Sequence, residues 1–399
     1  MIAVANCLAI QCRFGTVKRP EHTHPQLRIA ILNDVFDARD ATPDALLDRF
    51  TTLTGWANAS HAQGAAVLVC QRFHRNAQLT RSGVSYQFFA DRDGPRPSLT
   101  FSGNREAHYA AVSLNPNVAH VNGMDHPRAI RRLRAALPSG CAVVVQDHGG
   151  FEPRRLSWFR RRWIRSGLSA ASALLVSTGP QADEFRESGL LPDAIRVRDV
   201  MEASTDLRAN RPRIRDGRLN VLWVGRLNAN KDPLTVLEGF AKFADARPNA
   251  TLKFLYGTTE LESALRHALG RHRFLQDRVQ LAGAVSHQSL TEIYGDADLF
   301  VLGSHREGSG YAALEAMACG VVPVLTNIPS FRGLTDDGRA GELWDLGNPD
   351  SLAAALMRVT DGETLEVKRE ACLRRFESCF SWNAIGARAM AIYRECSVR

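Results

Sequence analysis

Short apolar segments alternate with longer segments of helical periodicity along most of the chain. In the amino-terminal half, five apolar segments predict β-strands, at residues 27–32, 65–70, 118–121, 142–146 and 174–177. In the carboxy-terminal half, five more predict strands at residues 219–224, 251–256, 279–281, 299–302 and 322–325. Continuous apolar strands with helices between them are typical of parallel sheets that are covered on both faces. We therefore expect an α/β protein with two Rossmann-like, doubly wound parallel-sheet domains.

The two series of strands are separated by residues 207–218, which are rich in Arg, Pro, Asp and Gly and lack apolar periodicity. We expect this segment to be an interdomain linker. The predicted organisation is an N-terminal extension at 1–26, a first domain at 27–206, the linker at 207–218, a second domain at 219–380 and a terminal helix at 381–399. Two doubly wound domains that face each other place a ligand cleft at the carboxyl ends of both sheets.

The composition predicts a folded, cytoplasmic protein. The 399 residues are 45% hydrophobic and 23% charged, which excludes disordered and fibrous classes. No apolar run approaches the roughly 20 residues needed to span a bilayer, and the first ten residues lack the features of a secretory signal. The eight cysteines form no CxxC pair, so we expect reduced thiols. The net charge of +8 comes from an arginine-rich composition with few lysines, and we do not expect a nucleic-acid partner.

Two cations and a helix start follow strand 219–224. Arg226 comes directly after the strand and a glycine, and Lys231 stands five residues further on. Asp232 and Pro233 are typical of the N-cap and the first position of a helix, which we expect over 234–246. A planar guanidinium, an ammonium and the amides of a helix N-terminus suit a diphosphate. The alternative is that both cations are exposed on a loop without a ligand.

A glycine-bearing loop with two carboxylates follows the fourth predicted strand of the second domain. Glu307 lies in the loop, and Glu315 lies in the first turns of a helix that we expect to begin near Tyr311 and to end at Gly320. The amides around residues 308–310 can approach a phosphate or a sugar closely, because glycine has no Cβ. Carboxylates accept bonds from vicinal sugar hydroxyls, so Glu315 suits a ribose and Glu307 a transferred sugar. The alternative is that both glutamates cap the helix or lie in water.

Several motifs of the second half together resemble those of the family 4 glycosyltransferases, which have the GT-B fold. They span most of residues 219–393 and comprise the Gly-Arg-x4-Lys loop, segments 279–285 and 297–300, the Glu-x7-Glu pair and segment 316–323. The resemblance implies that Arg226 and Lys231 bind the donor diphosphate. In full, it implies a nucleotide-sugar site made of Arg226, Lys231, Val285, Gly308, Ser309, Gly310, Tyr311 and Glu315, with Val285 near the base. It also implies that the terminal helix crosses back onto the first domain.

Two predicted strands of the first half end in histidines. His148 precedes two glycines and resembles the family's histidine near the donor sugar, whereas His120 has no such match. A lone histidine is more often a satisfied structural residue, and this alternative stays open for both. The resemblance implies a catalytic group of Glu307, His148, Arg226 and Lys231.

The resemblance implies retention of anomeric configuration during transfer of a hexose-type sugar from a UDP- or GDP-linked donor to an acceptor hydroxyl. The acceptor would be a saccharide or a lipid-linked saccharide, in the synthesis of a bacterial envelope polysaccharide, exopolysaccharide or glycolipid. The leaving phosphate would accept the acceptor's proton, so no enzymic base is required. We expect neither a further cofactor nor a metal, although segments 91–93 and 296–298 both fit an Asp-x-Asp pattern.

An arginine-rich segment with three aromatic side chains lies at residues 154–165. Such a segment suits an anionic membrane surface, where a lipid-linked acceptor is met, so the protein would be peripheral on the inner membrane face. The alternative follows from Phe159 and Trp163, which are four residues apart and would pack a helix onto a sheet while the arginines stay in solvent.

Two other functions stay open on the sequence alone. The first is a non-catalytic partner that binds a nucleotide sugar. The second is a Rossmann-type oxidoreductase, against which stands the lack of a GxGxxG motif after strands 27–32 and 219–224.

Overall fold

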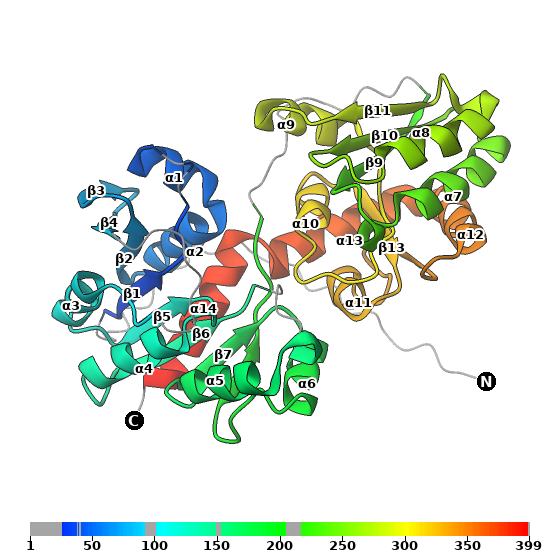
Figure 1. Ribbon diagram of the computed structural model, residues 1–399. Coiled ribbons are helices and arrows are strands. Elements are labelled where there is room, and N and C mark those ends of the chain that lie inside the picture. Colours follow the sequence, from blue (N-terminus) through cyan, green and yellow to red (C-terminus); the bar gives the residue numbers. More distant parts are fainter. Residues whose placement is uncertain are drawn as a thin grey trace, which may run out of the picture.

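The computed structural model describes residues 26–37, 39, 41–91, 101–148, 153–204 and 217–397 (Figure 1). The expected N-terminal extension therefore lies outside the described residues except for Gln26, and the expected linker does so except for residues 217 and 218. The described chain forms two sheets, each with helices on both faces (Figure 1). The predicted fold class, with two doubly wound parallel sheets, is confirmed.

The first sheet has eight strands in the order β3-β4-β2-β1-β5-β6-β7-β8, all parallel except β3. Its strands are β1 (Arg28–Asn33), β2 (Ala66–Phe73), β3 (Ala77–Arg81), β4 (Val84–Ala90), β5 (Val118–Asn122), β6 (Ala142–Gln146), β7 (Ala173–Val176) and β8 (Arg196–Asp199). Its helices are α1 (Pro43–Arg49), α2 (Thr51–Ala62), α3 (Arg105–Ser113), α4 (Pro127–Ala136), the 3-10 turn η1 (Pro153–Arg155), α5 (Trp158–Leu168) and α6 (Gly179–Glu187). The central strands are buried on both faces, as their continuous apolar sequences require.

The second sheet has six parallel strands in the order β11-β10-β9-β12-β13-β14. Its strands are β9 (Leu219–Gly225), β10 (Ala250–Tyr256), β11 (Val279–Gly283), β12 (Leu299–Leu302), β13 (Val322–Thr326) and β14 (Glu342–Trp344). Its helices are η2 (Ala229–Lys231), α7 (Pro233–Ala246), α8 (Glu262–Arg271), η3 (Arg273–Leu275), α9 (His287–Asp296), α10 (Tyr311–Ala318), α11 (Pro329–Thr335), α12 (Pro349–Val359), α13 (Thr364–Cys379) and α14 (Trp382–Ser397). The strand order reverses at β9, and in such sheets ligands bind beside the reversal point.

Several helices begin at a residue whose side chain accepts a hydrogen bond from a free backbone amide of the first turn. Asp232 caps α7 in this way, bonding the Thr235 amide at 3.3 Å, and Pro233 occupies the first turn, as the sequence predicts. The same device begins other helices, with caps at Thr42, Asn104, Ser157, Ser286 and Asn348.

The hairpin of β3 and β4 was missed by the strand prediction. Its two turn residues, Ser82 and Gly83, have φ of 51° and 78°, which matches a two-residue hairpin turn with two positive φ angles. Strand β3 is a short, largely exposed edge strand with polar residues, so it has no apolar signal in the sequence. Strands β8 and β14 were also missed, and each has only three or four residues.

Helix α14 joins the two domains, because it leaves the second domain after α13 and packs on α2 of the first (Figure 1). Ile385, Ala389 and Tyr393 are part of the core on this face of the first sheet. The helices approach closely at Gly386, where an added Cβ would lie 2.9 Å from the carbonyl oxygen of Ala59.

His120 fixes α14 to the sheet. The Trp56 indole, which can only donate, bonds the Tyr393 hydroxyl at 2.8 Å, and this leaves the hydroxyl proton available to Nδ1 of His120 at 2.6 Å. Burial lowers the pKa of His120 to about 3, so its ring is neutral and can accept this bond. Of the two interpretations of His120, the structure therefore supports the satisfied structural residue.

We predict that Tyr393→Phe lowers the free energy of unfolding by about 1–3 kcal/mol, because it leaves the buried Trp56 donor and the His120 acceptor without a partner. Urea unfolding followed by circular dichroism measures the change. Tyr109→Phe is the matched control, because that ring is 76% exposed. Equal stability of the two variants would show that the three-residue chain of bonds does not hold α14.

Candidate functional site

The candidate site lies at the carboxyl ends of β9 and β12, the two strands at the reversal of strand order. The loop after β9 carries Arg226 and Lys231. The loop after β12 carries Glu307, and the helix that follows it carries Glu315. The parallel sheet thus brings together the two sequence motifs that are about 75 residues apart along the chain.

The two loops are held together by the side-chain amide of Asn230. Its Oδ1 accepts from the Arg306 amide at 3.1 Å, and its Nδ2 donates to the Arg306 carbonyl at 3.0 Å. The Asn230 carbonyl also accepts from the His305 amide at 2.8 Å. Gly303 permits this approach, because a Cβ there would lie 2.9 Å from the Asp232 carbonyl oxygen. The loops therefore have one fixed relative position.

Lys231 and Glu307 form an ion pair between these loops. The Ser304 hydroxyl donates to the same carboxylate oxygen of Glu307 at 2.9 Å. Both charged side chains are mostly buried, with 12% of Lys231 and 14% of Glu307 exposed. An ammonium has three donors, so Lys231 can contact a phosphate oxygen while it keeps Glu307 within reach.

Glu315 is held by a buried tyrosine from the neighbouring helix α9. The Tyr294 hydroxyl donates to Oε2 of Glu315 at 2.9 Å and to the Ala312 carbonyl at 3.2 Å. Burial, and then the charge of Glu315, raise the pKa of Tyr294 well above its ordinary value. Tyr294 therefore stays a neutral donor at physiological pH and fixes the direction of the carboxylate.

Arg226 and Val285, two further residues of the predicted donor site, lie at the carboxyl edge of the second sheet. Arg226 is exposed at the end of β9, where a ligand can reach its guanidinium. Val285 follows β11 and is partly buried against the core of the second domain. Because β11 is the edge strand, β10 separates it from β9, which leaves Val285 at the far end of the same carboxyl edge.

The loop from Ser304 to Tyr311 also contacts the first domain. Ser309 is buried, and its hydroxyl lies 3.3 Å from that of Ser177, which follows β7. The Tyr311 hydroxyl lies 3.3 Å from that of Thr51 at the start of α2. Burial is the main cause that raises the pKa of Tyr311, so this hydroxyl is neutral. The carboxyl ends of the two sheets therefore face each other across this loop.

A cavity of about 450 Å³ lies beside this loop, between the domains. Its walls are the amino-terminal part of α6 and the segment 305–308, together with the start of α11. Arg306 and Glu184 form an ion pair of 2.8 Å from one domain to the other. Glu307 and Gly308 both line the cavity. Gly310 begins α10 with φ of 64°, a conformation that favours glycine.

His148 lies on the first-domain side, just after β6. Its Nδ1 is 2.5 Å from Oε1 of Glu202, and its Nε2 is 2.5 Å from Oδ1 of Asn122. Burial lowers the pKa of His148, but the bond to Glu202 and the charges of Glu202, Asp147 and Asp125 outweigh burial and raise it. About a third of the side chain is exposed. The two glycines that follow it lie outside the described residues.

The comparisons with known proteins agree with the geometry of the second domain. Residues 205–373 match the family model described as glycosyl transferases group 1. The chain carries a group 1 glycosyltransferase domain. It is 30% identical over 251 residues to a GDP-mannose:cellobiosyl-diphosphopolyprenol alpha-mannosyltransferase of Xanthomonas oryzae pv. oryzae, over 61% of this chain and 63% of that protein. It is 29% identical over 275 residues to a D-inositol 3-phosphate glycosyltransferase of Paenarthrobacter aurescens, over 63% of this chain and 64% of that one.

Solved structures with low sequence identity share the whole fold. A sucrose-phosphate synthase from Thermosynechococcus elongatus has a TM-score of 0.64 at 20% identity, over 93% of this chain and 99% of that one. The structure titled as trehalose-6-phosphate from E. coli bound with UDP-2-fluoro glucose has a TM-score of 0.65 at 13% identity, over 92% and 99%. The two-domain architecture of this chain is therefore the expected GT-B fold.

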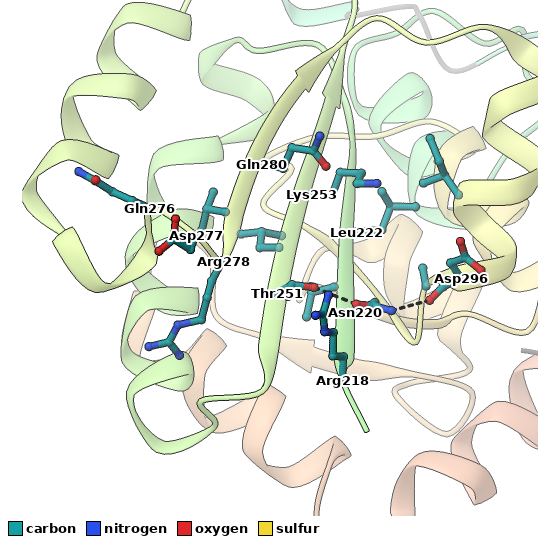
Figure 2. A pocket seen from close by; sticks show the side chains of 15 residues that line it. Arg218, Asn220, Leu222, Thr251, Lys253, Gln276, Asp277, Arg278, Gln280 and Asp296 are labelled. Carbon is teal, nitrogen blue, oxygen red and sulfur yellow. Dashed lines mark hydrogen bonds between the residues drawn. The ribbon is translucent and has the colours of Figure 1, made fainter. Parts of the chain in front are cut away.

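A second pocket of the glycosyltransferase domain lies at the opposite edge of its sheet (Figure 2). It has about 490 Å³ and is lined by the amino-terminal halves of β9, β10 and β11 and by the end of α9. Figure 2 shows Asn220 between Thr251 and Asp296, with bonds of 2.9 Å to Thr251 and 3.1 Å to the Asp296 carbonyl. This pocket lies far along the strands from Lys231 and Glu307, so it is separate from the candidate site.

The arginine-rich segment forms α5 in the first domain. Phe159 is 77% exposed and Trp158 is 60% exposed, whereas Ile164 and Leu168 are buried in the core. The expectation that Phe159 packs on the sheet is therefore wrong, because the buried face of α5 is shifted toward its carboxyl end. The side chain of Arg154 lies outside the described residues.

In the described part of the chain, no cluster of three or more His, Cys, Asp or Glu side chains is arranged to hold a metal ion. Of the two Asp-x-Asp patterns, Asp91 forms a buried ion pair with Arg72, and residues 92 and 93 lie outside the described residues. Asp298 accepts from the Asn220 amide at 3.0 Å and pairs with Arg369. Within the same described ranges, no helix is both long and apolar enough to cross a bilayer.

The residues that position the others were not predicted from the sequence. They hold the charged side chains of the candidate site or join its loops, and they are Asn230, Tyr294, Asn122 and Glu202. Asn230 directly precedes Lys231 in the sequence. Its role was not predicted because its hydrogen bonds join two loops, and the partner lies 76 residues away. Glu202 lies in the segment before the linker and had no signal of its own.

We predict that Asn230→Ala increases the rate of amide hydrogen exchange at Arg306 by roughly 2- to 12-fold, the effect of losing about 0.5–1.5 kcal/mol from one bond. Hydrogen exchange followed by NMR or mass spectrometry measures the rate. Asn230→Asp is the matched control, because its carboxylate still accepts from this amide. Unchanged exchange in Asn230→Ala would mean that the two loops are held together by something else.

Proposed function

We propose that the protein is a retaining glycosyltransferase that moves a hexose-type sugar from a UDP- or GDP-linked donor to a hydroxyl of a saccharide or lipid-linked saccharide. The product would belong to a bacterial envelope polysaccharide, exopolysaccharide or glycolipid. The observation that carries the proposal is the ion pair of Lys231 and Glu307 at the reversal point of the second sheet, with Glu315 on the next helix. The chain covers less than two thirds of the length of the mannosyltransferase and inositol-phosphate glycosyltransferase relatives, so their substrates are proposals for this chain.

The proposed donor lies along the carboxyl edge of the second sheet. Glu315, directed by Tyr294, accepts the two ribose hydroxyls. The diphosphate lies between Arg226, Lys231 and the amides at the start of α10, where Gly308 and Gly310 let the backbone approach. The base lies toward Val285, and the sugar lies toward Glu307 in the interdomain cavity. The mannosyltransferase relative is named for GDP-mannose, so this donor is the first to test.

The proposed reaction develops negative charge on the departing diphosphate and positive charge on the sugar ring. Lys231, Arg226 and the helix amides are placed to stabilise the first charge, and the carboxylate of Glu307 is near the second. The contacts of Ser309 and Tyr311 with the first domain close the cleft around these groups and exclude water. The acceptor hydroxyl then attacks from the face that the phosphate leaves, and the phosphate takes its proton.

We predict that Lys231→Ala lowers the rate of transfer by about 100- to 1,000-fold, because one stabiliser of the leaving charge is lost. Glu315→Gln is expected to raise KM for the donor, because it weakens the ribose contact. Release of nucleoside diphosphate from a panel of UDP-, GDP- and ADP-sugars measures both. The controls are Lys242→Ala, whose side chain pairs with Asp350 on the surface, and Glu292→Gln on an exposed position of α9.

Three results would contradict the proposal. A near-normal rate of transfer in Lys231→Ala, together with an unchanged donor KM in Glu315→Gln, would remove Lys231 and Glu315 from the site. A melting temperature that rises with a nucleoside diphosphate, without any release of it from the donors, would instead indicate a non-catalytic binding partner. A rise with NAD alone would indicate an oxidoreductase.

The proposed lipid-linked acceptor would be met at a membrane surface by α5. The exposed rings of Trp158 and Phe159 pack edge to face at 4.8 Å, at the start of a helix that also exposes Arg160 and Arg162. Exposed aromatic rings beside arginines suit the headgroup region of an anionic bilayer. The relative named for cellobiosyl-diphosphopolyprenol uses a lipid-linked acceptor, which supports this placement.

We predict that the double variant Arg160→Gln and Arg162→Gln binds anionic liposomes roughly 30-fold more weakly, at about 1 kcal/mol for each arginine. Co-sedimentation with phosphatidylglycerol vesicles measures binding. The control is the double variant Arg266→Gln and Arg339→Gln, which loses the same charge from the exposed surface of the second domain. Wild-type protein that never sediments with these vesicles, or an equal loss in the control, would contradict the membrane contact.

A further inference from the structure

Three side-chain amides form a row across the carboxyl ends of neighbouring strands in the first sheet. Gln71 on β2 is the register partner of Asn33 on β1, and Asn122 ends the next strand, β5. Gln71 is fully buried and Asn33 is 1% exposed. We call Gln71, Asn33 and Asn122 the amide row. It leads directly to His148, so its orientation decides which group faces that ring.

The orientation of the amide row is set at its buried end. Nε2 of Gln71 donates to the Val35 carbonyl at 2.9 Å and to the Arg72 carbonyl at 2.7 Å. A carbonyl can only accept, so this side of Gln71 must be its NH₂ group. Its oxygen therefore faces Asn33, whose Nδ2 donates to it at 2.7 Å.

The same orientation continues to the histidine. Oδ1 of Asn33 accepts from Nδ2 of Asn122 at 3.1 Å and from the Val35 amide at 3.4 Å. This leaves Oδ1 of Asn122 facing Nε2 of His148. Reversal of the whole row would set a buried oxygen of Gln71 against two carbonyl oxygens and leave the Val35 amide facing an NH₂ group, at the cost of unmet buried donors and acceptors.

Both ring nitrogens of His148 therefore face acceptors, because the Glu202 carboxylate lies on the other side at 2.5 Å. Two acceptors require two N–H donors. We propose that the amide row is a positioning relay that keeps both ring nitrogens of His148 protonated, so that His148 stands at the edge of the cleft as a fixed cation and not as a proton acceptor. Gln71, Asn33 and Asn122 are positioning residues, since they act through His148.

The charges around the ring agree with this state. The carboxylates of Glu202, Asp147 and Asp125 favour the charged ring and together raise the pKa of His148 against its burial. His120 also lies near on β5, but it is neutral because burial lowers its pKa to about 3. The other side chains that line the small cavity between His148 and Glu202 come from α2, from the start of α14 and from neighbouring strands, and they are uncharged.

The role of the His148 cation in sugar transfer rests on the proposed function. The protonation of both His148 ring nitrogens does not depend on that function. A ring with both nitrogens bonded cannot take a proton from an acceptor, which agrees with a reaction that uses the leaving phosphate as base. The side chain is about a third exposed, so its charge can instead act on a bound ligand from the first-domain side. Because the pKa is raised, the charge is present below the ordinary histidine value and is lost as the pH rises through the raised value.

The test is the ¹⁵N spectrum of the imidazoles in the full-length protein, with the His148 signal assigned by its loss in His148→Gln. We expect two protonated nitrogens on His148 at pH 7.5. Glu202→Gln should lower the pKa of this ring by about 1–3 pH units, the usual effect of one nearby carboxylate. Asn122→Leu should also lower the pKa of His148, because the ring loses an acceptor. Glu202→Asp should keep the His148 ring charged, because it retains a carboxylate. Glu370→Gln and Asn249→Leu, at exposed positions, should leave it unchanged.

A single protonated nitrogen in the wild type at pH 7.5, or an unchanged titration in Glu202→Gln, would overturn the proposal. A second measurement is the pH profile of transfer, which should lose activity at a lower pH in Glu202→Gln than in the wild type. The two proposals fail separately: a doubly protonated His148 in a protein that transfers no sugar would refute the function and leave the relay intact. Sugar transfer by a protein whose His148 is neutral would refute the relay and leave the proposed function intact.

Discussion

The arrangement of the second-domain site depends on the pairing of Asn230 with the backbone of Arg306. One side-chain amide matches both the donor and the acceptor of a peptide group, so it joins two loops in the way that one strand joins another. Lys231 directly follows Asn230, and Glu307 directly follows Arg306. The pairing of the two loops therefore brings the backbones of Lys231 and Glu307 together, and their side chains form an ion pair. The entropy that two flexible charged side chains would lose on meeting is reduced because the backbone has already been ordered.

The same loop is the place where the two domains meet. Its outer part contacts the first domain through Arg306, Ser309 and Tyr311, and α14 returns to that domain from the second. The backbone amide of Ser204, just before the linker, bonds the Phe380 carbonyl just before α14 at 3.4 Å, so both crossings lie side by side. The described contacts of this loop with the first domain are polar: one ion pair and two pairs of hydroxyl groups.

The sequence predicts those parts of the protein that follow from local patterns. Ten strands with continuous apolar runs were found, because a parallel sheet covered on both faces requires such runs. The edge strand β3 was missed because its polar residues face solvent. Lys231 and Glu307, which the structure brings together, were named as site candidates by type and spacing, whereas Asn230 and Asn122 were not. Their function depends on which residue lies opposite them on a distant loop or strand, and a register such as that of Asn33 with Gln71 is created only by folding.

Two cations at the cleft are each paired with a carboxylate of their own domain. Lys231 has Glu307 in the second domain, and His148 has Glu202 in the first. A cleft lined with unpaired cations would be repelled from closing, and a buried unpaired charge would cost several kcal/mol. With the pairs in place the cleft closes without net repulsion between these groups, and an entering diphosphate adds negative charge beside cations that are already desolvated. In the proposed reaction, the further charge that develops on the phosphate is then met by groups that need no rearrangement, which is the condition for stabilising a transition state more than a ground state.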